Sequence, residues 1–88
     1  MDRRINTRGW EILRAMNKSH DHRAQYIKAP PAKTVIQVGD IRFGDASEED
    51  SINCEEGFLA LESHGYIEQD VGLIYRLTTP GLEAGKIL

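Results

Sequence analysis

Apolar and small residues recur near the start of the chain with the spacing of a helix that packs on a core by one side. The positions are Ile5, Gly9, Ile12, Leu13 and Met16. They follow i, i+4, i+7, i+8 and i+11, which is one face of a helix, and most charged residues nearby fall on the other side. The pattern predicts a helix over Asn6 to Asn17, with Asn6 or Thr7 as its capping residue.

The next stretch lacks this spacing. Residues 19–33 contain Pro30 and Pro31, which disfavour both a helix interior and a central strand. We therefore predict a loop or arm over 19–33. The run from Thr34 to Phe43 is rich in β-branched and apolar residues, and Gly39-Asp40 occupies the position of a tight turn. This run fits either a short hairpin or one bulged strand.

A second helix is predicted over Ser47 to His64. Either Ser47 or Asn53 can cap it, so its start stays open within several residues. Its core face is made of Cys54, Phe58 and Leu61. Gly65 is placed to end the helix in a left-handed conformation.

Two short alternating segments follow, Tyr66 to Gln69 and Leu73 to Thr78, on either side of "DVG". Alternation around a turn predicts a β-hairpin. Thr79 followed by Pro80 then marks the start of a short last helix, Pro80 to Ile87.

The block from Leu61 to Gly81, "LESHGYIEQDVGLIYRLTTPG", resembles the winged helix-turn-helix superfamily, including small bacterial or phage-type members. The matching positions are Leu61, Glu62, Gly65, Tyr66, Ile67, Tyr75, Leu77, Thr78 and Gly81. The resemblance implies one α+β domain over residues 1–88, with about three helices, a small antiparallel sheet and a β-hairpin wing. It also implies DNA binding and transcription regulation as the function class.

The chain departs from that family in two respects. No second helix is predicted between the first helix and the helix that corresponds to the recognition helix. Counting from the core positions of that helix, Glu55, Glu56 and Leu59 are expected to face outward. Two adjacent carboxylates repel phosphates, so insertion of this helix into a DNA groove is not expected.

Charge is divided unevenly along the chain. Residues 1–43 carry nine basic and four acidic side chains, a net +5, whereas residues 44–88 carry two basic and ten acidic side chains, a net −8. A basic surface can meet a polyanion. The predicted phosphate-contacting residues are Arg3, Arg4, Arg8, Lys18, Arg23, Lys28 and Lys33.

Other chemistry has little support in the sequence. His20 and His22 offer two ligands but no complete metal site, and Cys54 is better placed in the core. Glycine-rich phosphate loops are missing, so we expect no enzyme activity, no cofactor and no metal. The single cysteine fits a reducing compartment, and without a long apolar run we expect a cytoplasmic protein with no signal peptide and no membrane partner.

Two function hypotheses follow. The first is a nucleic-acid-associated or regulatory protein that binds DNA through its basic N-terminal half, without sequence specificity and with steep salt dependence. The alternative is a protein-interaction module on a winged-helix scaffold, without DNA binding. In that case Glu55, Glu56 and Leu59 would meet a basic protein partner or a second copy of the chain.

Overall fold

The computed structural model describes residues 4–29 and 33–87 as helices packed on an antiparallel sheet. In chain order the elements are α1 (Thr7–Lys18), β1 (Arg23–Ala29), β2 (Lys33–Val38), β3 (Ile41–Phe43), α2 (Glu48–Ser63), β4 (Ile67–Gln69), β5 (Ile74–Leu77) and α3 (Thr79–Lys86). The five strands form one sheet in the order β3-β2-β1-β5-β4, and every pair is antiparallel. The α+β class predicted from the sequence is confirmed.

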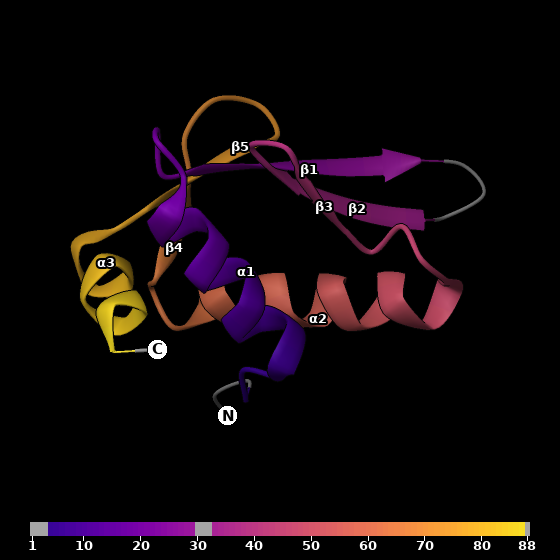
Figure 1. Cartoon of the computed structure of the whole chain (residues 1–88), viewed down its shortest axis with the longest axis horizontal. Helices are drawn as coiled ribbons and strands as arrows, with labels where there is room; N and C mark the ends of the chain where they lie inside the picture. Colours follow the sequence, from indigo (N-terminus) through magenta and orange to yellow (C-terminus); the bar gives the residue numbers. More distant parts are fainter. Residues whose placement is uncertain (1–3, 30–32, 88) are drawn as a thin grey trace.

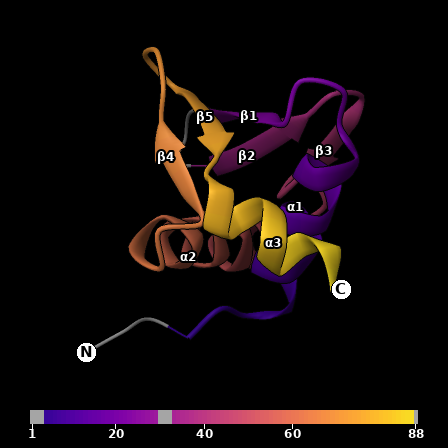
Figure 2. The ribbon, with the colours of Figure 1, turned by 90° about the vertical axis from the view of Figure 1, so that its left-hand side faces the viewer.

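The helices lie on one side of the sheet (Figures 1 and 2). Helices α1 and α2 cover the sheet, and α3 packs beside α1 at one end. Over the described residues, no helix covers the opposite side of the sheet. Residues from helices and strands meet in the core between the layers; the largest fully buried ones include Phe58, Ile12, Leu13, Met16, Ile36, Leu61 and Ile67.

Helix α1 forms where the spacing predicted it, with Asn6 as its cap. The Asn6 side chain accepts a hydrogen bond from the backbone nitrogen of Gly9 at 2.8 Å. Its Nδ2 donates to the carbonyl oxygen of Asn53 in α2 at 2.9 Å. One amide therefore satisfies a free N–H at the start of α1 and also joins α1 to α2.

The predicted loop or arm over 19–33 is wrong for residues 23–29. These form β1, which lies in the middle of the sheet between β2 and β5. Ala24 is buried and Tyr26 packs against the core, whereas Arg23 and Gln25 point to the other side and are exposed. The inward side of this strand carries Ala24, Tyr26 and Lys28, which are small, amphipathic and charged, so the alternation of apolar and polar residues was weak in the sequence. Residues 30–32 lie outside the described part.

The structure decides between the two alternatives for Thr34 to Phe43. Strands β2 and β3 are separate and pair through Ile36↔Phe43, Gln37↔Arg42 and Val38↔Ile41. The turn between them contains Gly39 with φ of 58°, which glycine adopts without strain. This segment is a hairpin.

The second half of the chain follows the predicted order. Ser47 caps α2 by accepting from the backbone nitrogen of Asp50 at 3.0 Å, which decides the open start of that helix. The predicted core face of α2 is buried, and Gly65 has φ of 76°. The β4–β5 hairpin and α3 also form, and the Thr78 side chain caps α3.

Ser51 in α2 completes the hydrogen bonding of a strand edge. Its hydroxyl accepts from the backbone nitrogen of Thr34 at 2.6 Å and donates to the carbonyl oxygen of Thr34 at 2.9 Å. Strand β3 pairs with β2 only from Ile36 onward, so it does not reach Thr34. A buried side chain of α2 therefore takes the place of a neighbouring strand there.

Candidate functional site

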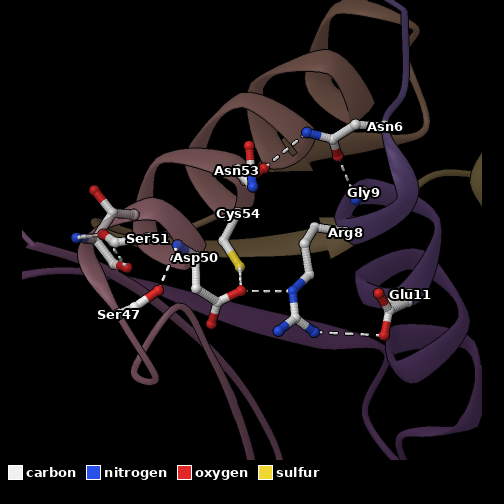
Figure 3. A network of polar contacts seen from close by, with 10 residues as sticks. Asn6, Arg8, Gly9, Glu11, Ser47, Asp50, Ser51, Asn53 and Cys54 are labelled. Carbon is white, nitrogen blue, oxygen red and sulfur yellow. Dashed lines mark hydrogen bonds and ion pairs between the residues drawn. The ribbon is translucent and has the colours of Figure 1, made fainter.

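Arg8, one of the predicted phosphate-contacting residues, lies between α1 and α2 (Figure 3). Its Nε lies 2.6 Å from Oδ1 of Asp50, and its Nη1 lies 3.4 Å from Oε2 of Glu11. The hydrogen bond to Asp50 raises the pKa of the Arg8 guanidinium. Because Asp50 already neutralises this charge, Arg8 serves as a contact between helices and is a poor ligand for phosphate.

Three more of the predicted residues are also bound within the protein. The contacts join Arg23 Nη2 to Asp70 Oδ2 at 3.1 Å, Lys28 Nζ to Glu55 Oε1 at 3.7 Å, and Lys33 Nζ to the Asp45 carbonyl oxygen at 3.5 Å. Arg23 and Lys28 lie on opposite faces of β1, because their positions differ by an odd number. The fold therefore does not gather the predicted set on one surface.

The rest of the predicted set differs in its surroundings. Arg3 lies outside the described residues. Arg4 and Lys18 are exposed, and neither forms an ion pair within the described part of the chain. Arg4 precedes α1 and Lys18 is its last residue, so the two charges lie at opposite ends of one helix.

Lys18 lies beside a surface hollow between α1 and α3 that sequence reasoning missed. The hollow has a volume of about 530 Å³. Its lining consists of Arg14, Asn17, Lys18, His22, Leu82, Gly85 and Lys86, with no acidic side chain. We call it the basic hollow. Arg14 and Lys18 are four residues apart on α1, a spacing visible in the sequence, but only the packing of α3 brings Lys86 to them.

His22, in the lining of the basic hollow, has an unusual backbone conformation. Its φ is 55°, and it is the only described residue other than glycine with a positive φ. Its Nδ1 lies 3.0 Å from the carbonyl oxygen of Met16 in the last turns of α1. Since a carbonyl oxygen only accepts, Nδ1 carries the hydrogen and Nε2 remains for another partner.

The basic hollow and the acidic start of α2 lie at different ends of the molecule. The first turn of α2 contains Glu48, Glu49 and Asp50. In Figure 1 this end of α2 lies at the right, whereas α3 lies at the left. The basic hollow and these three carboxylates are therefore separated along the longest axis, which is 35 Å. The two halves of the sequence are not, because Arg8 and Lys28 pair with Asp50 and Glu55 of the second half.

The predicted protein-binding residues of α2 do not form one outward surface. Glu55 was expected to face outward, and this is wrong: it turns to the sheet, where Thr34 Oγ1 donates to its Oε2 at 2.5 Å. Glu56 is exposed, and Leu59 is partly buried. The reason is that α2 lies along β2, so a second stripe of its surface meets polar groups of the sheet.

The side of the sheet away from the helices is a second accessible surface, which we call the bare sheet face. Its central cross-strand pairs are Gln25↔Gln37 and Gln25↔Ile74. A hollow of about 230 Å³ lies over these residues and Arg23. Most charge at this face is neutralised, since Arg23 is paired with Asp70 and Arg76 Nη2 lies 2.7 Å from Glu68 Oε1.

Chemistry of other kinds finds no assembled site among the described residues. No group of three or more His, Cys, Asp and Glu side chains there could hold a metal ion. Cys54 is fully buried, and burial raises the pKa of its thiol to about 11, so it is a poor nucleophile. No helix in the described ranges is both long enough and apolar enough to cross a membrane.

Comparison with protein-family models, with curated proteins and with solved structures gave no match. The resemblance to winged-helix proteins over Leu61 to Gly81 therefore stays a prediction from those residues.

Proposed function

We propose that this protein is nucleic-acid-associated or regulatory, and that it contacts phosphates through basic side chains of its first half, chiefly at the end of α1. The contacts are non-specific in sequence, because cations that touch only the backbone read no base edges. Lys18 and Arg4 are the predicted residues best placed for this role, and Arg14 and Lys86 extend the contact around Lys18.

One observation carries the proposal. The exposed cations without an ion pair in the described chain include Arg4, Arg14, Lys18 and Lys86, and three of these meet at the basic hollow. The acidic start of α2 lies at the other end of the molecule. A polyanion approaching the basic hollow would therefore meet three cationic side chains away from the carboxylates of α2, although Asp21 lines a neighbouring hollow together with Lys18.

The scaffold is proposed to be winged-helix-like. On this reading the β4–β5 hairpin corresponds to the wing and α2 to the recognition-type helix. The three strands between α1 and α2 stand where the family has a second helix, and Glu56 on α2 opposes phosphate. This proposal therefore assigns phosphate contact to α1 and α3 instead of α2.

Fluorescence anisotropy of a labelled DNA duplex tests the function. Binding should be weak and should fall steeply with salt, because counterion release supplies most of its free energy. Lys18→Gln combined with Arg14→Gln should weaken binding at low salt, whereas Glu56→Gln should leave it unchanged or strengthen it. The matched control is Arg23→Gln combined with Arg76→Gln, which makes the same change of charge at two arginines already paired with Asp70 and Glu68.

Two results would contradict the proposal. One is the lack of saturable binding to duplex or single strands at low salt. The other is binding that the Arg23 and Arg76 double substitution weakens as much as the Lys18 and Arg14 double substitution does, because the contact would then lie on the bare sheet face.

The alternative is a protein-interaction module that forms a homodimer or binds a basic protein. The bare sheet face favours it, together with apolar side chains in the β4–β5 connection and at the start of β5: Val71 is 69% exposed, Leu73 54% and Ile74 37%. Sedimentation velocity separates the two functions. Leu73→Arg should abolish self-association if this surface joins two copies, and it should leave DNA binding intact if the basic hollow is the functional surface.

A further inference from the structure

We propose that the basic hollow binds a phosphate monoester group. This inference rests on the proposed function, which is the reason for choosing a 5′-phosphorylated nucleic-acid end as the source of the ligand. A free nucleotide carries the same phosphate monoester. The ligand would be held by Arg14, Lys18 and Lys86, with His22 as a fourth donor.

Three cationic side chains line the hollow, and among the described residues they face only the partial negative charge of two helix C-termini. Arg14 and Lys18 reach it from α1 and Lys86 reaches it from α3, and no carboxylate lines it. Lys18 and Lys86 also lie in the last turns of their helices, where cations are favourable without any ligand. A favourable position at a helix C-terminus does not explain Arg14, which lies one turn earlier, or His22, which lies beyond the helix.

The shape of the hollow is fixed by close packing of α1 on α3. A Cβ on Gly85 would lie 1.7 Å from Nδ2 of Asn17, so the two helices meet with no room for a side chain at Gly85. Nδ2 of Asn17 also donates to the carbonyl oxygens of Leu13 at 3.1 Å and Gly81 at 3.3 Å. The charges are therefore carried by helices already held in place, which lowers the entropy lost on binding.

His22 adds a directed group to these charges. Because its Nδ1 donates to the carbonyl oxygen of Met16, the ring is anchored and Nε2 is left for a ligand. Its backbone is held in the left-handed region, which costs free energy for a residue other than glycine. When protonated, Nε2 would donate to a phosphate oxygen beside the Arg14 guanidinium and the two ammonium groups.

The chemistry of the hollow selects a monoester over a diester. A phosphate monoester carries about −1.5 to −2 charges near neutral pH and three terminal oxygens. A phosphodiester within a strand carries one charge per phosphate, spread along a line. Three cations around one hollow of about 530 Å³ match the concentrated charge of a chain end better than the extended charge of a backbone.

The test compares two oligonucleotides of one sequence, with a 5′-phosphate or a 5′-hydroxyl, by isothermal titration calorimetry at constant salt. The phosphorylated form should bind about 10-fold more tightly, the effect expected for added charge-assisted hydrogen bonds. Arg14→Gln, Lys18→Gln and Lys86→Gln should each remove most of that difference. Arg42→Gln makes the same change of charge at an exposed residue of β3 outside the hollow and should preserve it.

Further arms identify the role of His22 and the source of the ligand. His22→Asn keeps a residue that tolerates the left-handed conformation and should reduce the preference for phosphate. A nucleoside 5′-monophosphate that competes as strongly as the phosphorylated oligonucleotide supports the same site with a free nucleotide as ligand. Circular dichroism melting of every variant shows that a lost preference does not come from unfolding.

The results separate this inference from the proposed function. Equal affinity for the two oligonucleotides overturns the monoester site even when duplex binding persists. So does a preference for the phosphorylated form that Arg42→Gln removes as fully as Lys18→Gln. Conversely, monoester binding that depends on the residues of the hollow supports the site. If the same protein binds no duplex and no single strand that lacks a terminal phosphate, the general phosphate-backbone function is contradicted.

Discussion

Gly57 of α2 lies directly against the backbone of Gly9 in α1. A Cβ added at Gly57 would lie 2.5 Å from the backbone nitrogen of Gly9 and 2.7 Å from its Cα. Cβ atoms do not approach other heavy atoms so closely, so the two helices cross by backbone contact at this point. The crossing also holds Asn6 near Asn53, because both pairs lie at the same junction.

Gly57→Ala should destabilise the protein even though alanine favours a helix. Propensity alone would stabilise α2 by up to about 1 kcal/mol. Overpacking at the helix crossing should outweigh this and lower the free energy of unfolding by about 1 to 3 kcal/mol. Urea denaturation measures the change, with exposed Glu56→Ala as the control. A stabilised Gly57→Ala protein would mean that the helices do not meet here.

Ser51→Ala should expose the edge of β2. Its hydroxyl is the partner of both the N–H and the C=O of Thr34, so the substitution leaves two buried backbone groups without a hydrogen bond. The expected loss of stability is about 1 to 3 kcal/mol. Amide hydrogen exchange at low denaturant measures the effect at this site. The Thr34 amide should exchange faster in the variant, whereas the Ile36 amide, which belongs to the sheet core, should stay protected. Unchanged protection of Thr34 would refute this role.

The orientation of α2 predicts an order of mutational effects. Phe58→Ala and Leu61→Ala each remove a side chain exposed by 1% or less and should cost about 2 to 5 kcal/mol. Leu59→Ala, at a partly buried position outside the core cluster, should cost about 1 kcal/mol or less. Thermal or urea unfolding of the three variants gives the order. A Leu59 variant less stable than the other two would require a rotated helix.

Cys54 should make stability fall at high pH. Burial raises the pKa of its thiol from 9.0 to about 11. Between these values the folded protein keeps a proton that the unfolded chain releases, so rising pH favours unfolding across this range. Urea denaturation gives the free energy of unfolding of wild type and of Cys54→Ala at each pH. The difference between the two should decrease by up to about 2 kcal/mol from pH 8.5 to pH 11. A constant gap would mean that the folded thiol titrates as freely as the unfolded one.

The sequence by itself determined the helices and the last hairpin. A helix is stabilised by neighbours three and four residues away, so the stripe from Ile5 to Met16 and the core face of α2 were readable from spacing alone. The caps are local too, because Asn6, Ser47 and Thr78 each accept from a backbone nitrogen three residues on. The sequence offered Asn6 and Ser47 as one of two alternatives each, and the structure chose them and added Thr78. Gly65 and the alternating segments after it likewise needed only local rules.

Only the tertiary structure decided the place of β1 and the composition of the candidate site. A strand gains its hydrogen bonds from distant residues, and β1 takes them from β2 and β5, about 10 and 50 positions away. The sequence could count the positive charges of the first half, but not which of them Asp50, Asp70 and Glu55 would neutralise. Nor could it bring Lys86 to Lys18, because that meeting depends on Gly85 fitting against Asn17, a contact between residues 68 positions apart.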